Sequence, residues 1–263
     1  MLAIYLFEKQ GGLRIRFTQK VLTLFAGFLF ISIFFAVLLQ VEFSRPDDER
    51  CRIMPLGDSI TAGTPGTIGY RKKLYLDLIN SGFEVDFVGS QSAGSGFDPD
   101  HEGYGWKTAL FFNSRLNGPE DYLLKANSPD VILYHIGTNN LGSSDVLSYA
   151  LAANETLRII YEYDSEITVV LAKIILTTDS TRNTRVHNYN LLLEEYAHYW
   201  LDSGYSIIIV DMENALVPTL YPEGDLADMA HPNTSGYEKM ADVWYDALDE
   251  LLSDSAFQED TQS

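Results

Sequence analysis

Apolar residues in this chain are grouped into short runs, and each run is separated from the next by a longer segment of mixed polarity. Five runs have the length of buried strands: RIMPLG (52–57), EVDFVG (84–89), VILYHIG (131–137), ITVVLA (167–172) and SIIIVD (206–211). Most of them are continuous rather than alternating, which is typical of parallel strands that are covered on both faces.

The segments between these runs repeat their apolar residues with the spacing of helices. Residues 70–82 place Leu74, Leu78 and Ile79 on one face and end at Gly82, a residue type that often follows the last turn of a helix. Similar patterns cover 144–163, 181–204 and 234–252. This alternation predicts an α/β fold, a three-layer α/β/α sandwich with a mainly parallel five-stranded sheet, formed by residues 51–252.

A longer apolar run, residues 21–41, lies near the start of the chain and contains no charged residue. As a helix rising about 1.5 Å per residue, it would span about 30 Å, the thickness of a bilayer core. We therefore expect a transmembrane signal anchor. The alternative is a cleaved signal peptide, but such peptides have a shorter apolar region, and LLQVEFSRP (38–46) lacks a good small-x-small cleavage site.

The residues around this run predict its orientation. Residues 1–20 form a basic segment, which the positive-inside rule assigns to the cytoplasm. The domain would then be extracellular or lumenal, or secreted if the leader is cleaved. Residues 42–50 are polar and are expected to form a stalk, and residues 253–263 an acidic tail.

Composition narrows the classes of partner. The formal net charge is −19, so nucleic acid is an unfavourable partner and anionic polymers are unfavourable substrates. Cys51 is the only cysteine, so the chain can form neither an internal disulfide framework nor a thiolate zinc site.

Residues with catalytic chemistry follow several of the predicted strands. Gly57-Asp58-Ser59 follows the first strand, Gly89 the second and Gly137-Thr138-Asn139-Asn140 the third, and Asp228-Met229-Ala230-His231 precedes the last helix. Because ligands of such sheets bind beyond the carboxyl ends of the strands, we expect these segments to converge on one edge.

The chemistry of these residues is complementary. The Ser59 hydroxyl becomes a nucleophile when a base such as His231 takes its proton, and Asp228 can orient the imidazole. The backbone N–H groups of Ser59 and Gly89, with the Asn139 amide, can stabilise an oxyanion.

The segments GDSI (57–60), VGS (88–90), GTNN (137–140) and DMAHPN (228–233) resemble the conserved blocks of the SGNH (GDSL) hydrolase superfamily, which has a flavodoxin-like fold. The resemblance implies that Ser59 is the nucleophile, that Gly89 and Asn139 complete the oxyanion hole, and that Asp228 and His231 are acid and base. Asn140 departs from the aspartate that usually ends the third block, so other hydrogen bonds are expected to hold that loop.

The stretch HEGYGW (101–106), together with HPNTSGYEKMADVW (231–244), resembles the acetylxylan-esterase-like branch of carbohydrate esterases. The resemblance implies removal of O-acetyl groups from an acetylated polysaccharide or oligosaccharide, with no cofactor and no metal. Asp58, Tyr104 and Trp106 are the candidate substrate-binding residues, and the two aromatic rings could stack on a sugar. The alternative for Trp106 is packing in the core.

Two other functions remain open from the sequence. One is a lysophospholipase or thioesterase of the same superfamily, and the other is a catalytically weak, glycan-binding surface protein. The sequons at Asn154 and Asn233 would accept glycans in a host that glycosylates secreted proteins. Because Asn233 is close to His231, we expect it to remain unmodified.

Overall fold

The computed structural model describes residues 6–8, 13–15, 50–63, 67–116, 122–142 and 145–254. Its contacts divide the chain into two units, Met1–Asp48 and Glu49–Ser263. In the first unit, β1 (Leu6–Glu8) and β2 (Leu13–Ile15) form an antiparallel pair. The predicted anchor at 21–41 and nearly all of the predicted stalk and tail lie outside the described residues. Within the described part of the chain, no helix has both the length and the apolar character needed to cross a membrane.

The second unit is built around a mostly parallel sheet. Its strands are β3 (Cys51–Gly57), β4 (Val85–Phe87), β5 (Gln91–Ser92), β6 (Asp100–Gly103), β7 (Val131–His135), β8 (Thr168–Lys173) and β9 (Ile207–Asp211). The order is β5-β6-β3-β7-β8-β9, with β4 also paired to β3, and only the β5–β6 pair is antiparallel.

The five predicted strands correspond to β3, β4, β7, β8 and β9, and the α/β class is confirmed. Among the described residues, the sheet nevertheless has seven strands rather than five. The two additional strands have the sequences QS and DHEG, which carry no apolar run, so hydrophobic pattern alone could not find them. β6 pairs with β3 only at Leu56 and Gly57, beyond the part of β3 that pairs with β4.

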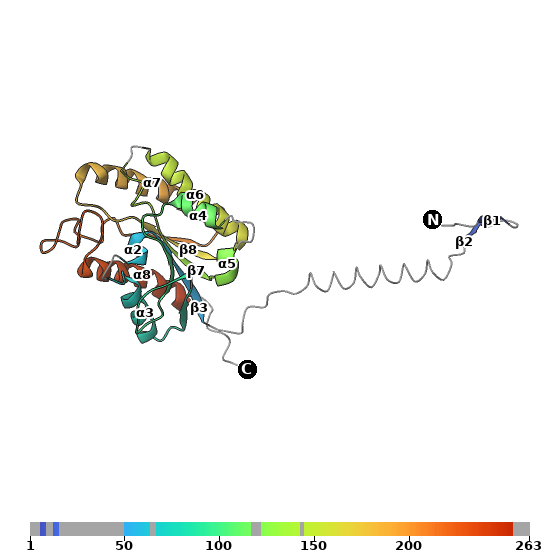
Figure 1. Ribbon diagram of the computed structural model, residues 1–263, viewed down its shortest axis with the longest axis horizontal. Helices are drawn as coiled ribbons and strands as arrows, with labels where there is room; N and C mark the ends of the chain where they lie inside the picture. Colours follow the sequence, from blue (N-terminus) through green and yellow to red (C-terminus); the bar gives the residue numbers. More distant parts are fainter. Residues whose placement is uncertain are drawn as a thin grey trace. The chain divides into compact units, whose positions relative to one another are not determined.

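Helices cover both faces of the sheet. They are α2 (Ser59–Ala62), α3 (Arg71–Asn80), α4 (Ala109–Leu116), α5 (Tyr122–Asn127), α6 (Val146–Tyr163), α7 (Ser180–Asp202) and α8 (Thr234–Asp254). Figure 1 shows α4, α6 and α7 on one side of the central strands and α3 and α8 on the other. Helices, sheet and helices therefore form the three layers of the predicted sandwich.

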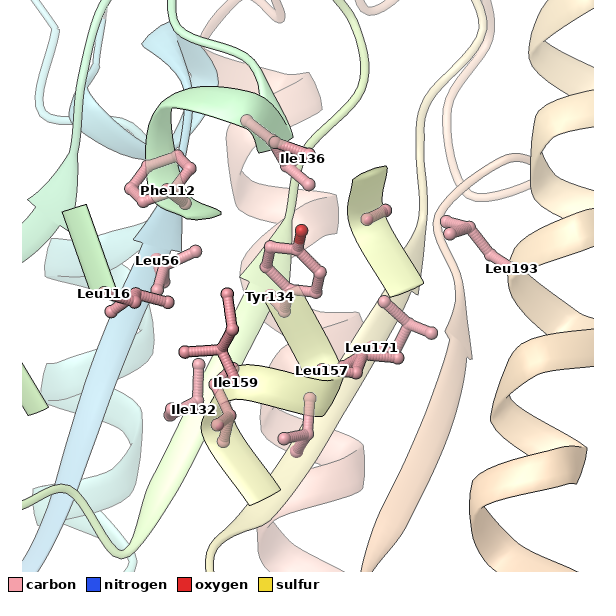
Figure 2. Close-up of a cluster of buried hydrophobic side chains, with 14 of the residues drawn as sticks. Leu56, Phe112, Leu116, Ile132, Tyr134, Ile136, Leu157, Ile159, Leu171 and Leu193 are labelled. Carbon is pink, nitrogen blue, oxygen red and sulfur yellow. The ribbon is translucent and has the colours of Figure 1, made fainter. Parts of the chain in front are cut away.

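Alternate residues of β7 point into two separate cores. Ile132 and Tyr134 join the cluster under α4, α6 and α7, whereas Val131 and Leu133 join the cluster under α3 and α8. Figure 2 shows Tyr134 in the middle of the first cluster. Burial of each such aliphatic side chain contributes about 1.5–3 kcal/mol, so the strand is held from both faces.

Two sequence-based expectations about the helices need correction. Leu74 and Leu78 of α3 are fully buried, but Ile79 is 43% exposed, because the buried face of this helix is narrower than the apolar spacing suggested. The predicted tail begins two residues too early, since α8 continues to Asp254.

Candidate active site

Ser59 is the first residue of α2, directly after the turn from β3, at the carboxyl edge of the sheet. The preceding Asp58 caps α2, with its Oδ1 accepting a hydrogen bond of 3.0 Å from the Ile60 N–H. A side chain at Gly57 would place a Cβ 2.3 Å from the carbonyl oxygen of His135, so only glycine fits where β3 approaches β7. The Gly-Asp-Ser sequence thus builds a tight strand-to-helix turn with the serine at its exit.

Ser59, His231 and Asp228 form a chain of hydrogen bonds, although Ser59 and His231 are 172 residues apart in the sequence. The Ser59 Oγ is 2.9 Å from the His231 Nε2, and the His231 Nδ1 is 2.8 Å from the Asp228 Oδ2. The second carboxylate oxygen of Asp228 accepts the N–H groups of Ala230 and His231 at 2.9 and 2.8 Å. This arrangement can take a proton from a serine hydroxyl and hold the resulting imidazolium.

Asp228 is kept ionised for this arrangement. Partial burial raises the pKa of its carboxyl, but hydrogen bonds from the backbone of Ala230 and His231 and from the His231 ring outweigh burial, so the net pKa is lowered. The carboxylate therefore stays charged, and able to accept the imidazole N–H, to below its ordinary titration range.

The segment that carries Asp228 and His231 is tied to the rest of the domain at several points. The Met229 carbonyl accepts the Thr178 N–H at 3.0 Å, which attaches the segment to the connection after β8. Asp225, which is 3% exposed, accepts hydrogen bonds from the Val217 N–H at 2.7 Å and the Lys239 Nζ at 2.6 Å. These bonds fix the segment against α8 before the chain reaches His231.

Gly89 follows β4 and lies against β6. With φ at +159°, a Cβ at this position would lie 2.2 Å from the carbonyl carbon of His101. A residue with a side chain would therefore push the two strands apart. The backbone N–H is thus presented on a segment that passes unusually close to β6.

The Asn139 side chain is fixed by the turn that follows β6. Its Nδ2 donates a hydrogen bond of 2.9 Å to the carbonyl oxygen of Lys107. Because an amide nitrogen has two N–H bonds, one donor remains for a ligand.

The loop that contains Asn139 is held largely through its backbone. Arg182 of α7 donates to the Thr138 carbonyl, Arg185 Nε donates to the Leu141 carbonyl at 2.7 Å, and the Asn140 N–H donates to the Gly137 carbonyl at 3.0 Å. These are the hydrogen bonds that stabilise the loop in a chain where asparagine replaces the usual aspartate. The two arginines were not found from the sequence, since nothing in a helical pattern indicates contact with a loop more than 40 residues away.

The three predicted substrate-binding residues have different surroundings. Asp58 is 0% exposed and caps α2, so its prediction as a substrate contact is wrong. Tyr104 is half-buried, with the guanidinium of Arg115 5.1 Å above its ring and with its hydroxyl 2.7 Å from the Ser90 Oγ. One face of the ring is thus covered by the protein's own side chain, and the role of Tyr104 as a substrate contact stays a prediction.

Trp106 is in the opposite situation. It is 85% exposed, so the alternative that it packs in the core is wrong. Its φ of +65° is a left-handed conformation that is unfavourable for a bulky residue. Trp106 immediately precedes Lys107, whose carbonyl accepts the Asn139 amide, so the exposed ring belongs to the same turn that contacts Asn139.

No group of three metal-ligating residues is found within the described ranges. His101 and Glu102, which are adjacent in the sequence, have other partners. The His101 Nδ1 accepts the Gly103 N–H at 3.0 Å, and burial, aided by Arg71, lowers the pKa of His101 to about 3. Glu102 forms an ion pair of 3.0 Å with Arg115.

The mostly parallel sheet with helices on both faces is consistent with the SGNH α/β fold. Residues 56–239 match the GDSL-like lipase/acylhydrolase family, and the chain belongs to this family.

Individual relatives agree with this class. The chain is 31% identical over 241 residues to a multidomain esterase of Ruminococcus flavefaciens, a match that covers 80% of this chain but only 30% of that longer protein. Among solved structures, it is similar to a family 3 carbohydrate esterase of Clostridium thermocellum, with a TM-score of 0.63 and 26% identity over 78% of this chain and 98% of that one. It is equally similar to an acetyl esterase mutant solved with an acetate ion, with a TM-score of 0.63 and 25% identity over 78% and 99% of the two chains.

Proposed function

We propose that this chain is a serine esterase that removes O-acetyl groups from an acetylated polysaccharide or oligosaccharide. The observation that carries the proposal is the hydrogen-bonded chain from Ser59 through His231 to Asp228. The likeness to a family 3 carbohydrate esterase and to an acetyl esterase supports the choice of an acetylated carbohydrate.

In the first half of the reaction, the Ser59 Oγ attacks the acetyl carbonyl carbon while its proton moves to the His231 Nε2. The carbonyl oxygen becomes an oxyanion, which the N–H groups of Ser59 and Gly89 and the Asn139 Nδ2 stabilise. The bond between the carbonyl carbon and the sugar oxygen then breaks, and His231 gives its proton to the departing sugar hydroxyl.

In the second half, a water molecule attacks the acetyl group on Ser59, and His231 takes the proton of this water. The tetrahedral intermediate breaks to release acetate, and the proton returns from His231 to the Ser59 Oγ. Asp228 stays ionised throughout and stabilises the imidazolium. These steps need no cofactor.

Trp106 is the candidate contact for the sugar. Its exposed indole is the kind of surface on which the apolar face of a sugar ring stacks, and its strained backbone conformation indicates a constraint other than stability. The net charge of −19 favours a neutral decorated glycan over an anionic one.

The proposed location follows from the sequence near the N-terminus. We propose that residues 21–41 anchor the protein as a single-pass membrane protein with residues 51–252 as the extracellular or lumenal SGNH hydrolase domain. The uncharged run of 21 residues after a basic segment supports this orientation. Protease protection in intact cells tests it, since a cytoplasmic domain would resist external protease.

Acetate release from acetylated xylan by the full-length protein tests the proposed activity. Ser59→Ala is expected to abolish release, and Ser81→Ala, at the distal end of α3, is expected to leave it unchanged. Hydrolysis of p-nitrophenyl acetate that requires Ser59, without release from xylan, would retain the serine mechanism and reject xylan as substrate. Release that persists in Ser59→Ala would contradict the mechanism itself.

A second candidate function is hydrolysis of a lipid ester or thioester. It is favoured by exposed apolar side chains on the connection between β9 and α8, which also carries Asp228 and His231; they are Val217, Leu220, Tyr221 and Met229. Rates on p-nitrophenyl esters from acetate to octanoate separate the two candidates. The acetyl esterase should be fastest on acetate, and rates that rise with chain length would favour the lipid esterase.

A further inference from the structure

Side chains from β6, the turn after β6 and α4 form a hydrogen-bonded cluster with Ser90, which directly follows Gly89. We call it the Glu102 cluster; its members are Glu102, Arg115, Tyr104 and Ser90. None of these side chains takes part in the proposed chemistry. Their contacts are nevertheless concentrated on the residue that directly follows Gly89.

The backbone on both sides of Gly89 is fixed. The Val88 N–H donates to the Ile53 carbonyl at 2.9 Å, and the Ser90 N–H donates to the Glu102 Oε2 at 2.8 Å. Gly89 itself lies so close to His101 that no Cβ fits. The direction of the Gly89 N–H is therefore determined by one backbone acceptor on β3 and one side-chain acceptor on β6.

The acceptor of the Ser90 N–H, Glu102, is a carboxylate whose side chain is 0% exposed. A buried carboxylate is unfavourable unless it is paired and hydrogen-bonded. Arg115 supplies the pairing: its Nε donates to the Glu102 Oε1 at 3.0 Å, and its terminal nitrogen donates to the Ser90 Oγ at 2.9 Å. The planar Arg115 guanidinium thus bonds to both the Glu102 carboxylate and the Ser90 hydroxyl. The same carboxylate accepts the backbone N–H of Ser90.

Tyr104 closes the cluster. Its hydroxyl is 2.7 Å from the Ser90 Oγ, and its ring lies under the Arg115 guanidinium, 5.1 Å from the ring centroid. The Tyr104 and Phe111 rings pack edge to face, with 5.0 Å between their centroids. Ser90 is therefore held by its N–H and by its hydroxyl, from two elements of the fold.

We propose that Glu102 is a positioning residue that directs the Gly89 N–H at the oxyanion, with Arg115 and Tyr104 keeping Glu102 and Ser90 in place. This inference rests on the proposed function, because it requires Gly89 to be an oxyanion donor. Glu102 does not touch the reacting atoms. Glu102 acts by orienting the Gly89 N–H, which must already point at the oxyanion when the transition state forms.

The size of the expected effect follows from general values for catalytic geometry. Loss of a whole oxyanion donor lowers turnover by about 100- to 1000-fold, and a displacement of about 1 Å lowers a rate by about 100-fold. In Glu102→Gln one of the two carboxylate oxygens becomes an NH2 group, which cannot accept the hydrogen bond that this oxygen receives from Ser90 or Arg115. The segment should therefore shift without losing the Gly89 donor. We expect kcat to fall by about 10- to 100-fold with little change in KM.

The experiment uses the full-length protein, p-nitrophenyl acetate as substrate and phenylboronic acid as a probe of the oxyanion site. The boron accepts the Ser59 Oγ as the proton moves to His231, and the resulting tetrahedral adduct places an oxygen where the oxyanion forms. Glu102→Gln should weaken boronate binding by a factor similar to the loss in kcat. A purely structural role would not link these two quantities.

Glu213→Gln is the matched control. The Glu213 side chain is 11% exposed, and it is 2.8 Å from the His187 Nδ1 and 3.0 Å from the Asn190 Nδ2, so it is also a largely buried, hydrogen-bonded carboxylate. Glu213→Gln should lower Tm without lowering boronate affinity. Equal losses of kcat and boronate affinity in both variants would overturn the inference.

A folded Glu102→Gln protein with wild-type kcat and boronate affinity would also overturn it. If that variant does not fold, Arg115→Lys and Tyr104→Phe decide, since both side chains are partly exposed and their loss should not disrupt the core. Each should lower kcat by about 3- to 10-fold, an effect smaller than that of losing the Glu102 carboxylate. An unchanged kcat in both variants would overturn the inference. Retained hydrolysis in Ser59→Ala would instead contradict the proposed function, so the two failures are distinguishable.

Discussion

The Asn139 Nδ2 donates a hydrogen bond of 2.9 Å to the carbonyl oxygen of Lys107, which joins the loop after β7 to the turn that exposes Trp106. The candidate oxyanion donor and the candidate sugar contact are therefore fixed to one another. A change in the turn at 104–107 is expected to affect both catalysis and substrate binding, but through different residues.

Trp106→Ala should raise KM for acetylated xylo-oligosaccharides by about 10-fold, equivalent to a loss of about 1.4 kcal/mol in binding. The physical reason is the loss of an exposed aromatic face beside the site. Hydrolysis of p-nitrophenyl acetate, which has no sugar, should change less than twofold. Tyr199→Ala is the control, because Tyr199 is also exposed but lies near the end of α7 that is remote from the carboxyl edge of the sheet. Equal KM values in wild type and Trp106→Ala would contradict this role.

The arginines of α7 should control turnover through the Asn139 loop. Arg185→Ala removes the donor to the Leu141 carbonyl and is expected to lower kcat by about 10-fold, because a small displacement of an oxyanion donor has a large effect on rate. Asn140→Asp restores the usual residue of the family and should leave kcat within about twofold, since arginine donors already hold this loop. Steady-state kinetics on p-nitrophenyl acetate measure both. A large gain in Asn140→Asp would show that the asparagine limits activity.

Asp58 should make stability depend on pH. Burial raises the pKa of its carboxyl to about 6, although hydrogen bonds, including that from the Ile60 N–H, partly oppose the shift. Because the folded protein holds the proton more tightly than the unfolded chain, this contribution to stability is complete below about pH 4 and is lost as pH rises through about 6. Its size is about 3 kcal/mol.

Asp58→Asn removes this titration and keeps an oxygen that can accept the Ile60 N–H. Urea unfolding at pH 4.5 and pH 7.5 should therefore give a smaller difference between the two pH values in Asp58→Asn than in wild type. The variant should gain stability relative to wild type at the higher pH. Identical pH dependence in the two proteins would rule out Asp58 as the titrating group.

Asn233 should carry no glycan when the protein is expressed in a glycosylating host. Its Oδ1 accepts the Gly236 N–H at 3.0 Å and its Nδ2 donates to the Gly224 carbonyl at 2.9 Å, so a sugar on this nitrogen would crowd a cap that starts α8. Peptide mapping by mass spectrometry measures occupancy. Full occupancy in an active protein would contradict the expectation.

The sequence was informative wherever a local pattern carries the information. Continuous apolar runs located β3, β7 and β8, because parallel strands buried on both faces have no polar side. The short motifs also identified Ser59 and His231, which the structure brings to 2.9 Å from one another. The roles of these residues remain proposals that the variants above test.

Burial and long-range contacts were not predictable in the same way. Asp58 and Tyr104 lie in motifs close to the site, and proximity in sequence gave no means of distinguishing a capping or clustered side chain from one that faces substrate. Trp106 is only two residues from Tyr104 in the sequence, yet its left-handed backbone leaves the ring exposed to solvent. Arg115 and Arg182 act on loops far along the chain, and a helical pattern indicates only which face is apolar.

The segment from Asp225 to Asn233 is hydrogen-bonded to Gly236 and Lys239 of α8, so the proposed base is placed by a part of the domain that is synthesised late. Ser59, by contrast, is made early. In the proposed mechanism, the Ser59 hydroxyl remains an ordinary alcohol until α8 has docked, whatever the state of the first strands. Hydrolysis of a chromogenic ester would therefore report completion of the entire fold, and truncations that shorten α8 should produce chains that are unreactive even where the sheet has formed.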